Sequence, residues 1–265
     1  MRKKNYLFVC FIPLLAACSS YTGVVNQRYD GTVIETDATA LTAYAETQMI
    51  IGAEKEMHSQ AIPNFFYDEP LKFVDEEYYR PLTHEPVTIG VDMPEGRYTI
   101  AKNDEVGTGY LTVLDVDDTK VYEKLLDYTQ STLELNLYEG MKIMANEGPM
   151  PRLLVIGKAV DPFGGAFMYG QAPPPVEEGQ KRFGNGVYHI GEHIEPGEYA
   201  IEVAVGSPSS GVNYVYLLHT DGSFQVFELT ADYRDWVEHA ITLTLDEGQI
   251  LYIASKATTM LTPTE

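Results

Sequence analysis

Beyond residue 86, apolar and polar residues alternate along the chain in short runs. In residues 133–137 and 241–245, every second side chain is apolar. Alternate residues of a strand point to the same face of a sheet, so each run predicts a half-buried strand. The turn pairs Glu139-Gly140 and Glu247-Gly248 follow these two runs and divide them from the next strands. This pattern predicts a mainly β structure.

The β pattern occurs twice. Segment 87–100, VTIGVDMPEGRYTI, matches segment 188–201, YHIGEHIEPGEYAI, at a constant offset of 101 residues. Later matches come in the same order and their offsets grow from 104 to 108, pairing 110–114 with 214–218 and 133–140 with 241–248. Growing offsets are typical of a duplicated unit with small insertions. Because a unit of about 75 residues is marginal alone, we expect the two units to pack on each other or on the amino-terminal segment.

Each unit is expected to open with a tight hairpin. Pro94-Glu95-Gly96 in the first copy and Glu195-Pro196-Gly197 in the second lie between two apolar runs. Proline presets φ and glycine accepts positive φ, so both triplets favour a turn.

Upstream of the repeat, the apolar positions follow a helical period. They are Leu41, Tyr44, Ala45, Met49, Ala53 and Met57. Thr36 or Asp37 is the expected N-cap, and Pro63 lies beyond the end. This spacing predicts one amphipathic helix. Its apolar face could lie against the β-units or bind a partner near the membrane.

The predicted fold class is mainly β, with two tandem related β-sandwich-like units preceded by an amphipathic helical segment. Proline and glycine are dense between the units and indicate a linker, semi-rigid where three prolines follow one another. The predicted segments are a signal peptide (1–17), a tether (18–35), an N-terminal helical and acidic-aromatic segment (36–85), β-unit 1 (86–159), the Pro/Gly-rich linker (160–184) and β-unit 2 (185–259).

The amino terminus carries a targeting pattern. Three cations at residues 2–4 precede an apolar run that is too short to span a bilayer of about 30 Å. The run ends in Leu15-Ala16-Ala17-Cys18, which resembles the lipobox of bacterial lipoproteins. The resemblance implies cleavage before Cys18, lipidation of its thiol, and in many such proteins acylation of the new amino terminus with a chain such as palmitate. It also implies an extracytoplasmic protein anchored by lipid to the cell membrane or outer membrane. The other cysteine, Cys10, would leave with the signal, so no disulfide is expected in the mature chain.

The repeated pattern also supports a resemblance. It consists of Ile-Gly, two variable residues, an apolar residue, Pro and Gly, and then Tyr and Ile. This resembles small β-modules repeated in uncharacterised bacterial surface proteins and lipoproteins, over about residues 87–159 and 187–257. The resemblance implies an all-β surface module and implies no catalysis.

Charge narrows the classes of partner. The chain has 18 basic and 39 acidic residues, for a formal net charge of −21. Such a chain would repel nucleic-acid phosphates, so we expect no nucleic-acid partner. The densest acidic runs, 75–77 and 115–118, are interpreted as solvated surface, with a Ca²⁺ site as the alternative.

No catalytic motif has the right context. His189-Ile190-Gly191-Glu192-His193 matches an inverted zinc-protease pattern that works only on a helix, whereas this segment contains glycine and precedes Pro196-Gly197. On a strand, residues i and i+4 lie about 13 Å apart, too far to share one metal. The chain also lacks a nucleophile elbow and a phosphate-binding glycine loop. We therefore assign no catalytic, cofactor-binding or metal-ligating residue and expect no cofactor.

Aromatic residues are the remaining candidate binding groups. The chain has 19 Tyr and one Trp. Tyr214, Tyr216 and Trp236 are candidate ligand contacts, because exposed aromatic rings stack on sugars or anchor protein partners. They equally suit ordinary strand positions. The predicted function is that of a non-catalytic binding or structural interaction module at the cell envelope, with an envelope protein or polysaccharide as partner. The alternative is an envelope glycan-binding protein or glycan-cleaving enzyme.

Overall fold

The computed structural model describes residues 38–47, 49–103, 107–127, 131–146, 152–162, 176–204, 212–230 and 240–264. Apart from Ala38, these residues belong to one compact unit, Thr39–Glu265. The predicted signal peptide, the tether with Cys18, and Trp236 lie outside the described residues. No helix in the described part of the chain is long and apolar enough to cross a membrane.

The first β-unit consists of two four-stranded layers. One layer has the order β2-β9-β4-β7 and the other β3-β8-β5-β6, and all neighbours within a layer are antiparallel. The strands are β2 (Tyr79–Leu82), β3 (Val87–Thr88), β4 (Gly96–Lys102), β5 (Gly109–Leu114), β6 (Lys120–Leu126), β7 (Thr132–Leu137), β8 (Lys142–Asn146) and β9 (Leu153–Ile156).

The second β-unit repeats this arrangement strand for strand. Its layers have the orders β10-β17-β12-β15 and β11-β16-β13-β14. The strands are β10 (Lys181–Phe183), β11 (Asn185–His189), β12 (Gly197–Val203), β13 (Val212–Leu218), β14 (Phe224–Thr230), β15 (Ala240–Leu245), β16 (Ile250–Ala254) and β17 (Thr259–Pro263). The mainly β fold class with two related sandwich-like units is therefore confirmed. Strand structure begins earlier than the sequence indicated, because β10 lies within the segment predicted as linker.

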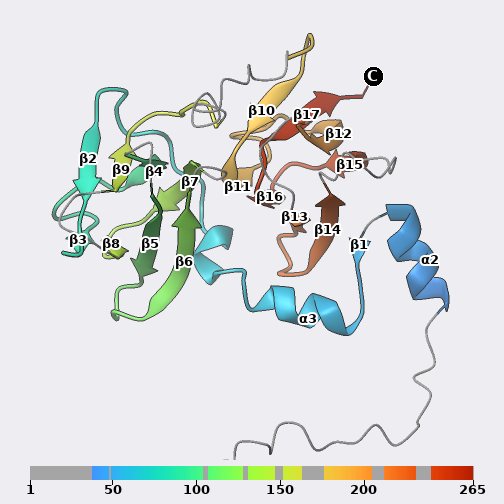
Figure 1. Cartoon of the computed structure of the whole chain (residues 1–265), viewed down its shortest axis with the longest axis horizontal. Coiled ribbons are helices and arrows are strands. Elements are labelled where there is room, and N and C mark those ends of the chain that lie inside the picture. The colour runs from blue at the N-terminus through green and yellow to red at the C-terminus, as the bar shows by residue number, and fades with distance from the viewer. Residues whose placement is uncertain are drawn as a thin grey trace, which may run out of the picture. The chain divides into compact units, whose positions relative to one another are not determined.

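The two units share one sheet. The order β1-β14-β13-β16-β11-β7-β4-β9-β2 joins a layer of the second unit to the non-equivalent layer of the first. The joint is a short parallel pairing of β7 with β11, in which Asn185 faces Leu133 and Gly186 faces Glu134 (Figure 1). The expectation that the units pack on each other is confirmed.

The predicted opening hairpins are wrong. β3 pairs with β8, while β4 pairs with β7 and β9 in the opposite layer, so the chain crosses between layers. The crossing is a tight loop in which the Gly90 N–H donates to the Met93 carbonyl at 2.7 Å. Ile89 and Met93 are 0% and 3% exposed, because the loop folds them over the end of the core. In the second unit, Gly191 donates in the same way to Ile194 at 2.8 Å.

The predicted single helix is interrupted. The structure has α2 (Ala38–Thr47), β1 (Met49–Ile50), α3 (Ala53–Ser59) and the 3₁₀ helix η2 (Asn64–Tyr67). Ile50 is buried and pairs with Val226 of β14, and Gly52 has a φ of 68°, so the helical path stops there. Two members of the predicted apolar stripe, Leu41 and Met57, are 54% and 69% exposed.

The segment around α3 and η2 packs against both β-units. Lys55 on α3 lies over the Phe224 ring at 4.7 Å from its centroid. Phe66 of η2 is 1% exposed and contacts the rings of Tyr122 and Tyr252. The main core cluster therefore runs from the first unit across one face of β13 and β16, where it includes Tyr216 and Tyr252. Alternate residues of these two strands belong to the separate core of the second unit.

Candidate functional site

Four tyrosines from the two β-units line a cavity of about 400 Å³. Tyr122 lies on β6 of the first unit, while Tyr214, Tyr216 and Tyr252 lie on β13 and β16 of the second. Tyr214 and Tyr216 are two residues apart on one strand, so they share a face. Tyr252 faces Tyr216 on the neighbouring strand, and the two rings stack with centroids 5.0 Å apart. The cavity therefore exists only where the two units meet.

Helix α3 contributes a histidine beside this wall. The Nδ1 atom of His58 lies 2.8 Å from the hydroxyl of Tyr216, and its ring packs edge-on against Tyr214 with centroids 4.7 Å apart. On the other side, the hydroxyls of Tyr122 and Tyr252 are 3.5 Å apart. Burial raises the pKa of Tyr122, Tyr216 and Tyr252. These phenols stay neutral at physiological pH and can both donate and accept hydrogen bonds.

Two lysines add positive charge to the cavity wall. Lys124 on β6 and Lys256 after β16 both line the cavity. Burial lowers the pKa of Lys124 to about 8, with a further lowering by Lys256, while the carboxylate of Asp127 opposes the shift. Among the described residues that line the cavity, one carries a carboxylate, Glu123, and it forms an ion pair with Lys120 at 3.1 Å. The wall is therefore suited to a ligand that combines a ring with an anionic group.

The structure brings together two of the three residues singled out from the sequence. Tyr214 and Tyr216 both line the tyrosine cavity, whereas Trp236 lies outside the described residues. Sequence reasoning missed Tyr252 and Lys124 as cavity residues. The short continuous apolar run of β16 suits a buried strand, but only the pairing of β13 with β16 places Tyr252 beside Tyr216.

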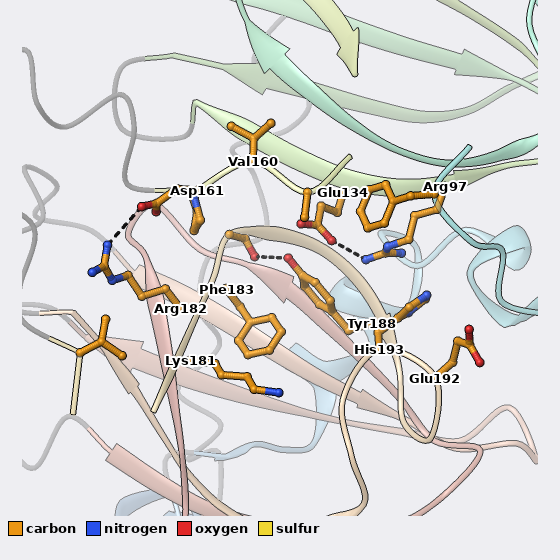
Figure 2. Close-up of a pocket in the computed structure, with 15 residues that line it drawn as sticks. Arg97, Glu134, Val160, Asp161, Lys181, Arg182, Phe183, Tyr188, Glu192 and His193 are labelled. Carbon is orange, nitrogen blue, oxygen red and sulfur yellow. Dashed lines mark hydrogen bonds and ion pairs between the residues drawn. The ribbon is translucent and has the colours of Figure 1, made fainter. Parts of the chain in front are cut away.

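A second cavity, of about 640 Å³, lies at the junction of the units (Figure 2). Arg97 on β4 is 1% exposed, and its Nη2 donates to Glu134 on β7 at 2.7 Å. Its Nη1 donates to the Val187 carbonyl of β11 at 2.8 Å. The guanidinium also lies over the rings of Phe73 and Tyr188, 5.5 and 5.2 Å from their centroids. Arg97 thus connects β4, β7 and β11 across the junction.

The two histidines of the His-Ile-Gly-Glu-His segment lie next to this arginine. As predicted, the segment is a strand end and a turn rather than a helix. The expected separation of about 13 Å is wrong, however. The chain turns after Ile190, and the ring centroids of His189 and His193 are 5.5 Å apart. Within the described ranges, no group of three or more His, Cys, Asp or Glu residues could hold a metal ion.

Both histidines are held neutral. The Nδ1 of His193 accepts a hydrogen bond from the His189 N–H at 2.9 Å, so this nitrogen carries no proton. The Nε2 of His189 lies 3.3 Å from the Asn136 amide, which also accepts from Arg97. Burial first, and then the charge of Arg97, lower the pKa of His189 to about 4 and that of His193 to about 3.

Most of the charged side chains that the structure describes at the junction cavity form ion pairs with other residues of the protein. Besides the Arg97–Glu134 pair, Arg182 pairs with Asp161 at 3.3 Å on the same wall. Figure 2 shows both pairs bridging parts of the cavity lining. This cavity therefore stabilises the junction, and we take the tyrosine cavity as the candidate functional site.

The acidic run at residues 115–118 shapes a turn between β5 and β6. The carboxylate of Asp115 accepts hydrogen bonds from the N–H groups of Asp117 and Thr119, both at 2.9 Å. Asp118 forms an ion pair with Lys142. The carboxylate of Asp115 is therefore used within the loop and that of Asp118 in a contact with β8, and this run belongs to no group of three or more such residues in the described chain that could hold a metal ion.

Comparison with known proteins defines no family. No protein-family model and no curated protein matches the chain. Among solved structures, one similar chain is an oxalate decarboxylase, studied for a structural element that modulates proton-coupled electron transfer. It is 9% identical, with a TM-score of 0.20 over 69% of this chain and 64% of that chain.

Another similar chain is the isomalto-dextranase of Arthrobacter globiformis T6 in complex with panose. It is 17% identical, with a TM-score of 0.17 over 67% of this chain and 33% of that chain. This protein thus spans less than two thirds of the length of either structure. Similarity at this level carries no functional argument, so the site is interpreted from its own geometry.

Proposed function

We propose that this protein is a lipid-anchored extracytoplasmic lipoprotein whose two β-units form a non-catalytic binding module at the cell envelope. The lipobox-like segment that ends at Cys18 supports the anchor. The tyrosine cavity carries the binding role, because it brings aromatic rings, phenol hydroxyls and two lysines together at one concave site. A mostly apolar pocket with a few polar groups is the usual form of a small-ligand site.

Metabolic labelling tests the anchor. Cells expressing the full chain are fed an alkyne analogue of palmitate, and the purified protein is examined for label. The wild type and the Cys10→Ala variant should both be labelled, since Cys10 lies within the predicted signal. The Cys18→Ala variant should lose the label and leave the membrane fraction. Equal labelling of both cysteine variants would show that the lipobox assignment is wrong.

A retention assay tests the binding module. The full-length chain is immobilised, and solubilised envelope polysaccharide and envelope proteins are applied separately. Saturable retention of one of them supports the proposal. The Tyr214→Ala variant should weaken this retention at least tenfold, because it removes a half-buried wall of the cavity.

Tyr110→Ala is the matched control. Tyr110 occupies the position of Tyr214 in the first unit, facing Asn146 where Tyr214 faces Ala254, and it lies outside the cavity. Tyr110 is 39% exposed, so its replacement should leave retention unchanged. If both variants weaken retention equally, the tyrosine cavity is not the binding site.

A further inference from the structure

We infer that the tyrosine cavity binds an acidic saccharide, with the sugar ring against the wall formed by Tyr214 and Tyr216 and its carboxylate at the ammonium of Lys124. This inference rests on the proposed binding function and names its ligand class.

Lys124 is an unusual cation for this molecule. The chain has a formal net charge of −21, yet the cavity brings Lys256 close enough to Lys124 to disfavour the charge of Lys124. Lys124 is also partly desolvated on β6, and the described part of the chain gives it no ion pair. The carboxylate of Asp127 favours the charged form of Lys124 through its electrostatic interaction with the ammonium. Such a cation costs stability unless an anion pairs with it, so a bound carboxylate would supply the missing partner.

The other cavity walls favour a sugar. A sugar ring has apolar C–H faces and a rim of hydroxyls. The rings of Tyr214 and Tyr216, tilted by 53° to each other, offer an angled apolar surface, and the hydroxyls of Tyr122 and Tyr252 lie 3.5 Å apart. Neutral phenols can donate to and accept from sugar hydroxyls.

A phosphate group fits this cavity less well. Arginine forks and backbone N–H groups at helix starts are the usual phosphate ligands. No arginine and no helix start lies among the described residues that line the cavity. Its volume of about 400 Å³ is near the lower end of the usual range of about 300–1,000 Å³ for ligand pockets. The site therefore suits one or two sugar rings rather than a long segment of a partner protein.

A neutral analogue isolates the role of the carboxylate. Uronate disaccharides and their methyl esters are titrated calorimetrically into the full-length chain in detergent. The ester keeps the ring and removes the charge, so the acid should bind at least tenfold more tightly than the ester. Raising the salt concentration should weaken binding of the acid and leave the ester unaffected, because salt screens charge pairs.

Substitution of Lys124 tests whether its ammonium binds the carboxylate. Lys124→Gln should remove the tenfold preference for the acid and leave ester binding unchanged. Lys72→Gln is the control, because Lys72 is 85% exposed and does not line the cavity. Thermal melting checks that both variants fold. Because Lys124 is partly buried as a cation, Lys124→Gln should melt no lower than the wild type.

The outcomes separate this inference from the proposed function. If the acid and the ester bind equally, or if Lys124→Gln keeps the preference for the acid, the acidic-saccharide assignment is wrong. The proposed binding function still stands in that case, provided that Tyr214→Ala weakens binding of the acid or the ester. If neither saccharide binds, the acidic-saccharide assignment also fails. The retention assay with envelope proteins then becomes the test of the proposed binding function. Displacement of the acid by an acidic peptide of equal or higher affinity would overturn the saccharide class as well.

Discussion

One tyrosine in each repeat closes the loop that precedes it. The hydroxyl of Tyr98 donates to the carbonyl of Pro94 at 2.6 Å, and the hydroxyl of Tyr199 donates to that of Glu195 at 2.8 Å. The glycine of each Ile-Gly pair, Gly90 or Gly191, has a positive φ that other residues rarely adopt. Gly90 has a φ of 86°, and a Cβ there would lie 2.8 Å from the Glu139 side chain. The glycine and the tyrosine that both copies of the repeat share are thus residues that stabilise the loop where the chain crosses between layers.

Removal of the Tyr98 hydroxyl should destabilise the protein. Tyr98 is fully buried, whereas Tyr199 is partly exposed. Tyr98→Phe leaves the Pro94 carbonyl without its donor, and we expect the free energy of unfolding to fall by about 1 kcal/mol. Tyr199→Phe should cost less, since water can replace the lost hydroxyl. Urea denaturation of both variants measures the difference, and an equal cost would refute this account of the two loops.

Strand positions follow from local patterns, but strand partners do not. The alternation in residues 133–137 and 241–245 correctly indicates β7 and β15. Nothing local distinguishes them, yet β7 pairs with β11 across the junction, whereas β15 pairs with β12 alone among the described strands. Similarly, helical periodicity ran through Met49, where long-range pairing of β1 with β14 interrupts the helix.

The junction between β7 and β11 depends on a glycine. A Cβ on Gly186 would lie 2.7 Å from the carbonyl oxygen of Glu134. Because this contact is with backbone, Gly186→Ala should force the strands apart and cost at least about 2 kcal/mol. Gly222→Ala is the control, since its φ is also positive, at 81°, but its Cβ would meet nothing within 4 Å. That variant should cost about 1 kcal/mol from backbone strain alone.

Chemical denaturation of the two glycine variants measures these costs. A cost for Gly186→Ala no greater than that for Gly222→Ala would show that the parallel pairing adds little to stability.

Mild acid should lower the free energy of unfolding of the whole molecule, because two neutral histidines lie at the junction of the units. Unfolded histidines titrate near about 6.5, whereas burial and Arg97 lower the pKa of His189 to about 4 and of His193 to about 3. Below about pH 6.5 the unfolded chain therefore binds more protons than the folded chain. The stability from the neutral histidines is complete above that pH and is lost progressively as the pH falls towards 4 and 3.

Urea denaturation at pH 7.5 and pH 5.0 measures this loss, which we expect to be at most about 2 kcal/mol for each histidine at the lower pH. His193→Asn is the control variant, because asparagine can accept the His189 N–H bond without titrating. The first unit supports this choice, since Asp92 accepts the equivalent bond from Thr88 at 2.8 Å. A pH dependence that is unchanged in His193→Asn would assign the acid sensitivity to other groups.

The amino-acid sequence by itself determined the strand periodicity, the duplicated unit and the turns at Glu139-Gly140 and Glu247-Gly248, because each of these depends on residues near one another in the chain. The lipobox-like segment is also known from sequence alone, and it supports the proposed anchor. Only the tertiary structure decided which layers join, that the opening loops cross between layers, and that Tyr122, Lys124 and Tyr252 meet Tyr214 and Tyr216. These residues come from two units and three strands. Their proximity depends on long-range pairing and burial, which local patterns do not encode.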